Sequence, residues 1–562
     1  MSLFEDILTS RGITGKIRDG FLNPSYDARH DPFLLPDMLP AVDRLELALK
    51  NQEHITIYGD YDIDGLTATT VLLDSFESFG FKKVDAFIPN RFVEGYGLTI
   101  DAVDKIAATG ATLIVTVDCG SLSEKEIVHA GTLGVDVIVT DHHNVAPVQP
   151  PAIAVINPKR LLQDYPDEYK NYLLKSDSAM VGKIYPFLDL AGVGVAFKLV
   201  QALQTRLDGL AHGHEKWLLD LVALGTVCDI VTLVDENRAN VFWGLKVLAQ
   251  AKRPGLRALM AVAGVEPHMV NARHLGFGLG PRMNAAGRLE TAQFSLDMLR
   301  AKEPMQALEA AQKLDAMNIA RRADQDKIFK EAIIQAEQYK NDKVLVVSSS
   351  GWSHGIIGIV AAKLLEKYKK PTYVLEEMGE ESKGSARSYG DFSAADAIRA
   401  SDDIIIKGGG HKFAAGVTMA TANIPAFRQR VNEFYDQQKF VDQRNLLLPK
   451  ADAAVLSLSH VNAELIAQLA QLEPFGSGNP EPILRAEELL VINQRKMGAE
   501  SQHVKLELQD ESGKAMQFLA FSAPAHFFAE PGDRVTIWFQ PTVNEWMGRR
   551  SVEGRLLHLE LI

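Results

Sequence analysis

Four short segments of this chain bring carboxylate and imidazole side chains together at spacings that suit metal ligation. They are residues 59–65, 117–120, 140–143 and 227–229, and their acidic or histidine residues are Asp60, Asp62, Asp64, Asp118, Asp141, His142, His143 and Asp229. Carboxylates two residues apart, such as Asp62 and Asp64, can reach two neighbouring ions. Two divalent ions about 3.5 to 4 Å apart stabilise the attacking and leaving oxygens of an in-line phosphoryl displacement. We therefore expect a two-metal centre for phosphoester hydrolysis.

The donor set also indicates which ions to expect. Carboxylate oxygens with one or two imidazoles suit Mn²⁺ or Mg²⁺, whereas a structural zinc site would use thiolates. Cys119 and Cys228 each adjoin a candidate aspartate, but neighbouring residues on a strand point to opposite faces, so we expect both to be packing residues. The acidic run at residues 60–65 alone also fits a calcium-type or turn-capping loop. The other three segments favour the two-metal interpretation.

Apolar, β-branched runs precede these segments and predict how they are positioned. The clearest runs are residues 55–58, 113–117 and 135–139, a pattern typical of buried strands in a parallel sheet. Ligand groups in an open α/β sheet lie beyond the carboxyl ends of the strands. We expect all four segments, that of Asp229 included, to act as acidic strand ends and to converge on one site.

Length and composition limit the fold and the partners. A chain of 562 residues is too long for one core and should divide into several domains. Its net charge of −13 argues against nonspecific coating of nucleic acid, although bound cations would neutralise a metal-binding cluster. The start of the chain lacks a basic segment followed by an apolar one, and no long uncharged apolar stretch follows. We expect a cytoplasmic protein with no membrane contact.

The patterns along the chain predict an α/β protein with four parts. Residues 1–300 form the first part, in which residues 50–160 alternate strand-like and helical segments of a parallel sheet and residues 190–289 are mostly helical. The proline-containing segment before residue 50 is expected to cap the sheet. Residues 301–340 favour a long connector helix, although an ordinary packed helix fits as well. A second α/β domain is expected over residues 341–440. Residues 441–562 predict a helical lead-in and a small all-β barrel that suits an OB-fold.

Two adjacent imidazoles directly after a buried strand are uncommon, and Asp141-His142-His143 resembles the signature of the DHH phosphoesterase superfamily. The other acidic segments match the remaining metal motifs of that superfamily in order, so residues 1–300 resemble a DHH catalytic domain with an N-terminal cap segment. The resemblance implies one ion on Asp62, a second on Asp64, His142 and Asp229, and Asp118 bridging both. It also implies that His143 contacts the scissile phosphate or the attacking water.

A glycine-rich run over residues 408–416 resembles the nucleotide-binding motif of the DHHA1 domain, which follows in this superfamily. Glycines let backbone amides approach a phosphate closely, so Gly409 and Gly410 are candidates, and His411 can add a donor. Lys383, Ser385 and Arg387 would donate to a terminal phosphate. Most glycine runs are only loops, and an exposed charged loop is the alternative for residues 383–387.

Three further stretches, residues 90–98, 190–197 and 280–289, narrow the resemblance to the bacterial RecJ exonucleases. With the OB-like tail, the resemblance covers essentially the whole chain from residue 50. It implies that the donors to the strand or the active site are Arg91, Arg282, Asn284 and Arg288, although a structural salt bridge is the alternative for any one arginine. Cys119 stands where the family commonly has Asn, and Cys228 stands in place of the more usual Ala. The position of the Asp229 loop is therefore the least defined.

Aromatic and basic side chains interleave in the tail, as in OB-folds that bind single strands by base stacking. Some of the aromatics must fill the barrel, and we expect these to be Phe518 and Trp538. Trp546 lies in a turn-like segment and is the expected exposed stacking platform.

The resemblance implies a two-metal-dependent 5'→3' exonuclease that degrades single-stranded DNA to nucleoside 5'-monophosphates in recombination and repair. Polarity and DNA preference come from the resemblance, not from spacing. One alternative is a DHH-DHHA1 phosphodiesterase acting on short oligoribonucleotides or cyclic dinucleotides, which usually lacks an OB-like tail. Another is a noncatalytic replication scaffold, whose metal ligands would have been lost. The family resemblance implies a single-strand-binding protein as a partner, and we expect a monomer.

Overall fold

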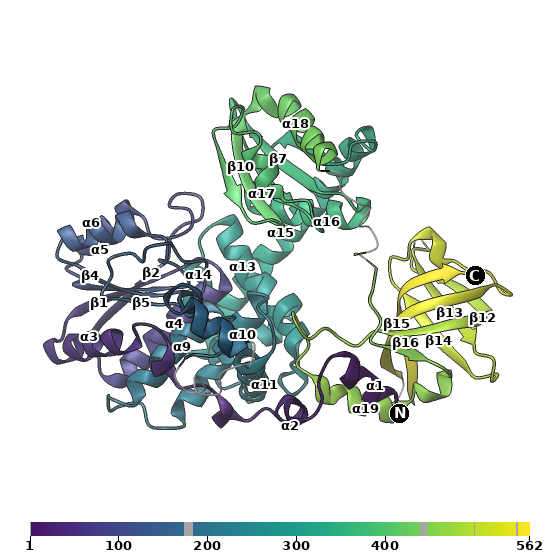
Figure 1. The fold of residues 1–562 in the computed structure, drawn as a ribbon, viewed down its shortest axis with the longest axis horizontal. Helices are drawn as coiled ribbons and strands as arrows, with labels where there is room; N and C mark the ends of the chain where they lie inside the picture. The colour runs from purple at the N-terminus through teal and green to yellow at the C-terminus, as the bar shows by residue number, and fades with distance from the viewer. Residues whose placement is uncertain (1, 174–183, 439–445, 447, 500, 547–548) are drawn as a thin grey trace. The chain divides into compact units, whose positions relative to one another are not determined.

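The structure, a computed structural model, describes residues 2–173, 184–438, 446, 448–499, 501–546 and 549–562. The chain divides into two compact units (Figure 1), Met1–Ala316 with Ala451–Ile562, and Met317–Lys450. The first unit holds a parallel sheet, a helical region and a C-terminal barrel, and the second unit holds a separate mixed sheet.

The first sheet is wholly parallel, as predicted, with the strand order β2-β1-β3-β4-β5. Its strands are β1 (His54–Gly59), β2 (Lys83–Phe87), β3 (Leu113–Val117), β4 (Asp136–Thr140) and β5 (Ala154–Ile156). Strands β1, β3 and β4 are buried along almost their whole length. Helices α5 (Ile100–Ala108) and α6 (Glu124–Thr132) cover one face (Figure 1), where their apolar residues share a core with Tyr58 and Val139.

The strand register brings the ends of the three central strands into line. Gly59 of β1 pairs with Val117 of β3, and Val117 pairs with Thr140 of β4. Each of these residues is the last of its strand, so the next residue along each chain segment is an aspartate at the same edge of the sheet. The parallel register therefore places three of the four acidic segments together.

The rest of the N-terminal part of this unit is mostly helical. Its longer helices are α2 (Lys16–Leu22), α3 (Met38–Asn51), α4 (Ile63–Phe79), α8 (Pro166–Leu173), α9 (Gly192–Gln204), α10 (Leu219–Cys228), α11 (Asp235–Leu248), α12 (Pro254–Val262), α13 (Gly280–Leu289) and α14 (Gln293–Arg300). Most residues of α4, α9 and α10 are buried, because these helices are apolar on nearly all sides. They form a firm support beside the acidic strand ends.

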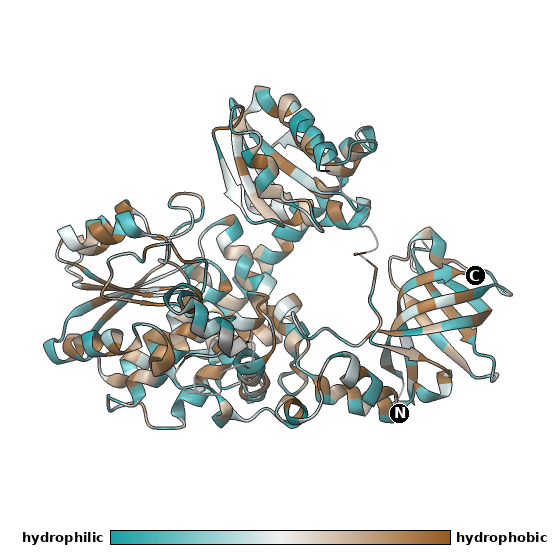
Figure 2. Cartoon of the chain, in the orientation of Figure 1, coloured by the Kyte–Doolittle hydropathy of each residue, from teal (hydrophilic) through white to brown (hydrophobic). Residues whose placement is uncertain are grey.

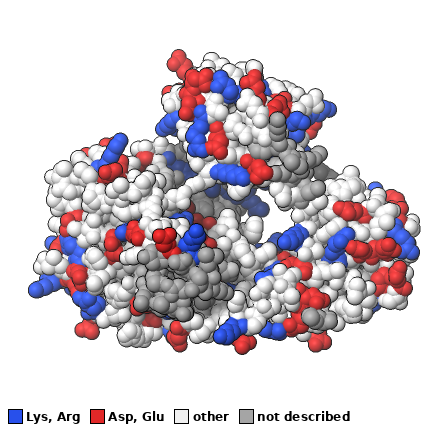
Figure 3. Space-filling model, viewed as in Figure 1, with Lys and Arg blue, Asp and Glu red and all other residues white. Residues whose placement is uncertain are grey.

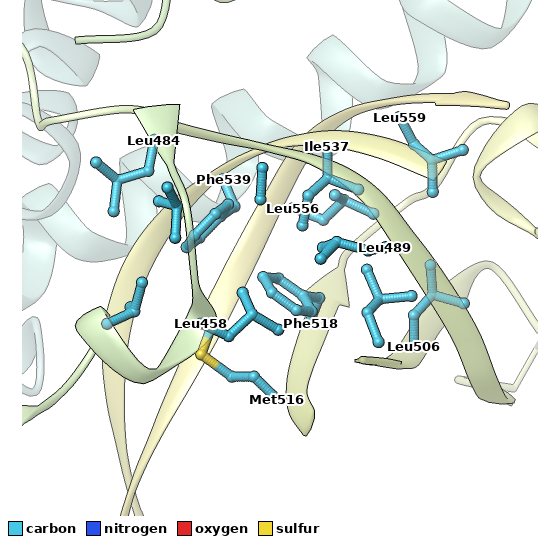
Figure 4. Packing of buried hydrophobic residues seen from close by; sticks show 14 of the residues in the cluster. Leu458, Leu484, Leu489, Leu506, Met516, Phe518, Ile537, Phe539, Leu556 and Leu559 are labelled. Atoms are coloured by element: carbon cyan, nitrogen blue, oxygen red, sulfur yellow. The ribbon is translucent and has the colours of Figure 1, made fainter. Parts of the chain in front are cut away.

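The C-terminal part of the first unit is a closed five-stranded barrel, which agrees with the expected OB-fold. Its strands are β12 (Leu484–Met497), β13 (His503–Gln509), β14 (Ala515–Ala520), β15 (Arg534–Trp546) and β16 (Arg549–Leu561), and a short β11 (Ala453–Val455) extends the sheet. Pairing of β12 with β15 closes the barrel. Apolar and polar residues alternate along the strands (Figure 2), and Phe518 and Phe539 meet edge to face inside (Figure 4).

The first helix of the chain belongs to the barrel core. Helix α1 (Leu3–Ser10) buries Phe4, Ile7 and Leu8 in the same apolar cluster as the barrel strands. Arg11 then binds Asp452 at 2.8 Å and donates to Asn479 at 2.9 Å. The expected cap on the parallel sheet before residue 50 is therefore wrong for the first residues, which cover the barrel. Their apolar pattern predicts burial but not the partner.

The connector predicted over residues 301–340 is helix α15 (Pro304–Gln338). The second unit that follows has the strand order β6-β7-β8-β10-β9. Its strands are β6 (Leu345–Ser350), β7 (Thr372–Met378), β8 (Glu381–Arg387), β9 (Lys407–Gly410) and β10 (Ala414–Ala420), and its helices are α16 (His354–Tyr368), α17 (Ala394–Arg399) and α18 (Ile424–Gln437). Strands β8, β9 and β10 are antiparallel neighbours. Helix α19 (Ala463–Leu469) leads back into the barrel.

Charge is mixed on the face of the molecule that Figure 3 draws. Acidic and basic side chains are interspersed there in place of one continuous basic surface. Among the described residues, we find no helix with the length and apolar character needed to cross a membrane.

Candidate metal centre

Asp60, Asp62 and Asp64 follow strand β1 and begin helix α4. Asp62 caps the helix: its Oδ1 accepts hydrogen bonds from the backbone N–H of Asp64 at 2.9 Å and of Gly65 at 3.2 Å. This cap satisfies amides that a helix start leaves without partners. Asp60 is buried, and its Oδ1 has no hydrogen-bond partner among the described residues. One short segment thus supplies three fixed carboxylates.

Asp64 is held by the start of helix α9. Its Oδ2 accepts from the Gly192 N–H at 2.6 Å, and its Oδ1 accepts from the Val193 N–H at 2.9 Å. An anion is favoured there because helix N-termini carry partial positive charge. A Cβ atom at position 192 would lie 2.9 Å from carboxylate oxygens of both Asp64 and Asp118. Glycine is therefore required for this close approach.

Asp118 directly follows β3 in an unusual backbone conformation. Its φ is 62°, in the left-handed region that is costly for a residue with a Cβ atom. The side chain is buried, and Oδ1 lacks a hydrogen-bond partner among the described residues. The surrounding structure therefore holds Asp118 in a conformation that aims an unsatisfied oxygen into the site.

Asp141 orients the two histidines that follow it. Its Oδ1 accepts from the N–H of His142 at 2.7 Å and of His143 at 3.1 Å, and lies 2.9 Å from His143 Nδ1. Its Oδ2 accepts from the Ser121 N–H at 3.0 Å. A proton on His143 Nδ1 satisfies the contact with Asp141, which leaves Nε2 for other partners. The Tyr96 hydroxyl also lies 3.1 Å from His143 Nδ1.

Asp229 reaches the site from a helix, so its expected position at a strand end is wrong. It is the C-cap residue of α10, and Ile230 after it has a φ of 62°. The apolar run before Asp229 has no strong periodicity, and a buried helix and a buried strand look alike in such a run. With 21% of its side chain exposed, Asp229 is more open to solvent than Asp64 or Asp118.

The four segments converge as predicted, with His142 at the centre. Its Nε2 lies 3.1 Å from Asp118 Oδ1, 3.6 Å from Asp229 Oδ2 and 3.7 Å from Asp64 Oδ2. Ligand atoms lie within 4.8 Å of one another in three sets, which are Asp60 with Asp62 and Asp118, Asp64 with His142 and Asp229, and Asp118 with His142 and His143. Two neighbouring groups of donors therefore share Asp118.

Burial and mutual repulsion disfavour the ionised carboxylates. Burial, followed by the charge of Asp62, raises the pKa of Asp64 to about 7. Burial, followed by the charge of Asp64, raises the pKa of Asp229 to about 9 and that of Asp118 well above its usual range. Burial likewise raises the pKa of Asp60. Such a cluster is costly unless cations neutralise it.

The pKa values of the two histidines are shifted in opposite directions. Burial and the neighbouring His143 lower the pKa of His142 to about 3, so His142 is neutral and suited to bind a metal. Burial alone would lower the pKa of His143, but the hydrogen bond and charge of Asp141 raise it overall. The donor set is rich in oxygen, contains unsatisfied buried atoms and could hold Mn²⁺ or Mg²⁺.

Three residues of this site are not among the functional residues predicted from the sequence. Asp60 stands first in the i, i+2, i+4 acidic run after β1. Gly192 and Tyr96 lie in stretches that carry only the family resemblance. The acidic spacing could have indicated Asp60, whereas the contacts of Gly192 and Tyr96 arise between distant segments.

Three family models match the chain: "DHH family, N-terminal domain" over residues 54–226, "DHHA1 domain" over residues 341–437 and "RecJ OB domain" over residues 453–558. The single-stranded-DNA-specific exonuclease RecJ of Salmonella typhimurium is 33% identical to the chain over 534 residues, which cover 91% of this chain and 88% of the relative. The chain belongs to the RecJ exonuclease family.

Other relatives agree with this membership. The RecJ exonuclease of Bacillus subtilis is 36% identical over 555 residues, which cover 98% of this chain and 66% of that protein. This chain thus spans just under two thirds of the length of that relative. The crystal structure of Thermus thermophilus RecJ in complex with Mn²⁺ matches 99% of this chain and 78% of its own, with a TM-score of 0.81 and 28% identity.

In this RecJ family member, the predicted strand-binding residues of the first unit have different surroundings. The Arg91 guanidinium lies 4.3 Å from the centroid of the Tyr61 ring, and its buried Nε has no hydrogen-bond partner among the described residues. Arg282 is bound by Asp315 at 2.7 Å and by the Gly278 carbonyl at 2.7 Å, which is the structural salt bridge considered as the alternative. Strand binding by either arginine stays a prediction.

Helical spacing separates the candidates on α13. Asn284 and Arg288 are four residues apart and share one face of the helix, whereas Arg282 lies on another. Burial raises the pKa of Tyr61 to about 12, while the charges of Arg91 and Arg288 oppose that shift. Arg288 and Arg91 are therefore close to the same phenol beside Asp60 and Asp62. Strand binding by Asn284 and Arg288 also stays a prediction.

The predicted phosphate-binding residues of the second unit lie across three antiparallel strands. Ser385 of β8 pairs with Gly416 of β10, and Gly416 pairs with Gly409 of β9. A Cβ atom at Gly409 would meet nothing within 4 Å. Arg387 shares the Ser385 face of β8 and lies 3.4 Å from the Ser385 hydroxyl. A row of glycines thus leaves open space beside these two side chains.

Arg387 is a cation without a carboxylate partner in the described part of the chain. Its Nη1 donates to the Ala386 carbonyl at 2.8 Å, and burial lowers the pKa of its guanidinium. A Cβ atom at Gly358 of α16 would lie 2.9 Å from the Ser385 hydroxyl and 3.4 Å from the Arg387 guanidinium. Gly410 ends β9 with a φ of 137°, and His411 follows it in an exposed turn.

In the barrel, one of two core predictions is correct. Phe518 is fully buried, but Trp538 is only partly buried and points outward. The neighbouring Ile537 and Phe539 fill the core, and alternation along a strand sends Trp538 to the other face. There the Arg485 guanidinium lies 4.9 Å from its ring centroid. The predicted platform Trp546 ends β15, and its side chain lies outside the described residues.

Proposed function

We propose that this chain is a metal-dependent exonuclease that degrades single-stranded DNA from the 5' end and releases nucleoside 5'-monophosphates. The observation that carries the proposal is the clustering of Asp62, Asp64, Asp118, His142 and Asp229 in neighbouring sets of donors, in a chain that belongs to the RecJ exonuclease family. The DNA substrate follows the names of the relatives. The 5'→3' polarity follows the family resemblance alone.

We propose that two divalent ions bind at this centre. Asp60, Asp62 and Asp118 would hold one ion, and Asp64, His142 and Asp229 would hold the other. Asp118 would bridge both ions, as the resemblance implies, and its Oδ1 lies 3.1 Å from His142 Nε2 of the second set. When bound, such a pair of ions activates a water molecule and stabilises the charge on the attacking and leaving oxygens of the phosphodiester. Asp60 is an addition to the ligand set that the resemblance implied.

The residues around the centre position the reacting groups. Asp141 fixes the ring of His143 through Nδ1, so that Nε2 can donate to the scissile phosphate or contact the attacking water. The Tyr96 hydroxyl contacts His143 Nδ1 as well, and it donates to the Asp118 carbonyl oxygen at 3.4 Å. Gly192 allows α9 to hold Asp64. These contacts fix the side chains before substrate arrives, which lowers the cost of reaching the reactive geometry.

The second unit would bind a terminal phosphate or nucleotide through Arg387, Ser385 and the Gly409–Gly410 backbone, with His411 as a further donor. Arg387 supplies the charge, and the glycine row supplies space for backbone approach. The absence of a carboxylate near Arg387, within the residues described, supports an anionic ligand. This assignment is tested separately from the metal centre.

Neither alternative function is favoured. A noncatalytic scaffold would not need the five-residue ligand set, and every member of that set is present and clustered. A phosphodiesterase for dinucleotides usually lacks a barrel like the one matched by the RecJ OB domain. A cytoplasmic location, a monomeric state and a single-strand-binding protein as partner are part of the proposal and rest on the composition and the family.

The decisive experiment is an end-labelled digestion with the full chain. A 5'-phosphorylated single strand carrying a label at the 5' or the 3' end is compared with the matching duplex and with a dinucleotide, in Mn²⁺ and in Mg²⁺. We expect early release of the 5' label as a mononucleotide from the single strand. First release of the 3' label would overturn the polarity, and faster cleavage of the dinucleotide would overturn the substrate.

The full chain is preferable to a truncation in this experiment. Removing the barrel would expose Phe4, Ile7 and Leu8 of α1, which are buried in its core. It would also remove the carbonyl groups of residues 471–474 that accept hydrogen bonds from Arg238 of α11. A loss of activity after truncation would therefore mix lost strand binding with lost stability.

A further inference from the structure

A cavity of about 540 Å³ lies in the first unit at the C-terminal end of helix α4. Its lining includes Asp74, Glu77 and Ser78 of that helix, whereas the metal centre uses Asp62 and Asp64 at the other end. A helix rises 1.5 Å per residue, so about 20 Å separates Asp64 from Glu77. The cavity is therefore distinct from the metal centre.

The inner wall of the cavity combines apolar side chains with a network of ion pairs. Its buried apolar residues are Leu248, Leu256, Met260 and Leu299. Arg253 binds Asp220 at 3.0 Å and Asp74 at 2.8 Å, and both contacts are largely screened from water. Arg300 also lies 4.0 Å from Asp74, so both carboxylates of the wall are paired with arginines, and ligand binding is left to the groups at the mouth.

The mouth carries an aromatic ring and a cation that is free to bind an anion. Trp217 is 41% exposed, and the Lys252 ammonium lies 3.6 Å from the centroid of its ring. No carboxylate of the described residues lies within ion-pair distance of Lys252. Arg300 and Lys302 also line the mouth and share Glu77 at 3.3 and 2.9 Å. Cations therefore outnumber carboxylates here, in a chain whose net charge is −13.

We propose that this cavity binds a nucleoside 5'-monophosphate, with the base against Trp217 and the phosphate on Lys252. Cavities of about 300 to 1,000 Å³ lined by apolar side chains and a few polar groups are typical small-molecule sites. Indole rings stack on bases, and a lysine ammonium binds phosphate as a point charge. The nucleotide rests on the proposed function, because hydrolysis would release this product at the protein.

The Lys252 ammonium has a favourable contact both in the empty cavity and in the cavity with nucleotide bound. Its ammonium rests over the indole ring, which is a favourable position for a cation without a carboxylate. A base that stacks on the same ring displaces the ammonium, and the flexible lysine side chain lets it follow the phosphate. The ligand thus replaces one contact of Trp217 and gives Lys252 an anionic partner.

The test is calorimetric titration of the full chain, in EDTA, with deoxyadenosine 5'-monophosphate, deoxyadenosine and inorganic phosphate. EDTA removes the divalent ions on which nucleotide binding at the metal centre would depend, and the titrations are made in the Arg387→Gln background, so that the phosphate site proposed in the second unit does not contribute. We expect one molecule of nucleotide to bind per chain, and the nucleoside and phosphate to bind at least about tenfold more weakly, since each makes only part of the contacts. Equal binding of phosphate and nucleotide would overturn the role of the base.

Variants locate the binding. Lys252→Gln and Trp217→Phe are each expected to weaken nucleotide binding, Lys252→Gln by about tenfold or more because a charge-assisted contact is lost. The matched control is Lys246→Gln, since Lys246 lies 4.3 Å from the Trp243 ring in an equivalent pair that does not line the cavity. Lys252 is exposed, so its replacement leaves folding intact, which thermal unfolding verifies.

Two results overturn the proposal: no nucleotide binding in EDTA, or binding that Lys252→Gln and Lys246→Gln leave equally unchanged. Failure of the proposed exonuclease function is a separate outcome. It would appear as a lack of strand hydrolysis in Mn²⁺ while nucleotide still binds in EDTA and depends on Lys252.

Discussion

The two α/β sheets of this chain present their ligand groups in opposite ways. In the first unit, the parallel strands β1, β3 and β4 end in line, and the carboxylates gather beyond their ends. In the second unit, the antiparallel strands β8, β9 and β10 carry the candidate groups along one face, and glycines keep that face open. The first arrangement concentrates charge, and the second provides space.

The difference extends to the ligands that each sheet can attract. The strand ends hold buried carboxylates whose pKa values are raised by burial and by one another, so they favour cations. The face of the second sheet holds Arg387, which is half-buried and has no carboxylate partner in the described region, so it favours an anion.

Replacement of the shared carboxylate should produce the largest effect. Asp118→Ala removes a ligand of both proposed ions, and loss of several kcal/mol of charge stabilisation corresponds to a fall in kcat of about 10³-fold or more. Strand binding, measured by fluorescence anisotropy, should be largely retained because other residues make those contacts. Asp101→Ala on the exposed start of α5 is the control. Full activity of Asp118→Ala would rule out the two-metal centre.

Asp60 offers a sharper test of the strand-end arrangement. Asp60→Asn keeps the size of the side chain but removes its charge, and we expect activity in Mn²⁺ to fall by about 100-fold, as for residues that support a metal site. Excess Mn²⁺ should restore part of the activity, because the variant binds metal more weakly. If activity is lost without any change in metal dependence, Asp60 supports the fold and is not a ligand.

The parallel sheet and its convergent site could be predicted because the signals are local. Each apolar run followed by an aspartate marks a strand end, and parallel register brings such ends together without further information. Asp229 shows where this reasoning fails. Its apolar run resembles a buried strand, yet it forms helix α10, and only packing against α4 and α9 decides between them.

Contacts between distant segments could not be predicted. The burial of α1 in the barrel, the support of Asp64 by Gly192 and the contact of Tyr96 with His143 each join residues far apart in the sequence. The pairing of Arg282 with Asp315 is of the same kind. By contrast, the outward position of Trp538 follows from strand alternation and could have been predicted once Ile537 and Phe539 were placed inside.

The open face of the second sheet should give a smaller effect than the metal centre. Arg387→Gln removes the charge proposed to bind a terminal phosphate, and we expect the KM for a 5'-phosphorylated strand to rise by about tenfold or more, since a charge-assisted hydrogen bond is lost. The kcat should change little. Arg399→Gln, on an exposed arginine paired with Asp396, is the control in the same unit. An unchanged KM would remove Arg387 from strand binding.

The smallest effect is expected in the pH dependence of stability without metal. Asp64 and Asp229 have pKa values of about 7 and about 9 in the folded chain, above the value of an unfolded aspartate of about 4. A carboxyl group whose pKa is raised by folding contributes stability that is fully present below about pH 4, the pKa in the unfolded chain. This stability is lost as the pH rises from there through the pKa in the folded chain. In EDTA, the Tm should therefore fall as the pH rises toward about 9.

Mn²⁺ should reverse this trend, because the ionised carboxylates that destabilise the free protein are the form that binds the ion. The gain in Tm on adding Mn²⁺ should thus be larger at about pH 8 than at about pH 6.

Asp229→Asn removes the group with the higher of the two pKa values. It should therefore flatten the pH dependence of the Tm in EDTA and reduce the gain in Tm with Mn²⁺. Arg387→Gln should alter neither, because the open face of the second sheet carries no such cluster among its described residues. If the Tm of the unmodified chain, of Asp229→Asn and of Arg387→Gln depends on pH to the same extent, the carboxylates at the strand ends do not repel one another as the structure implies.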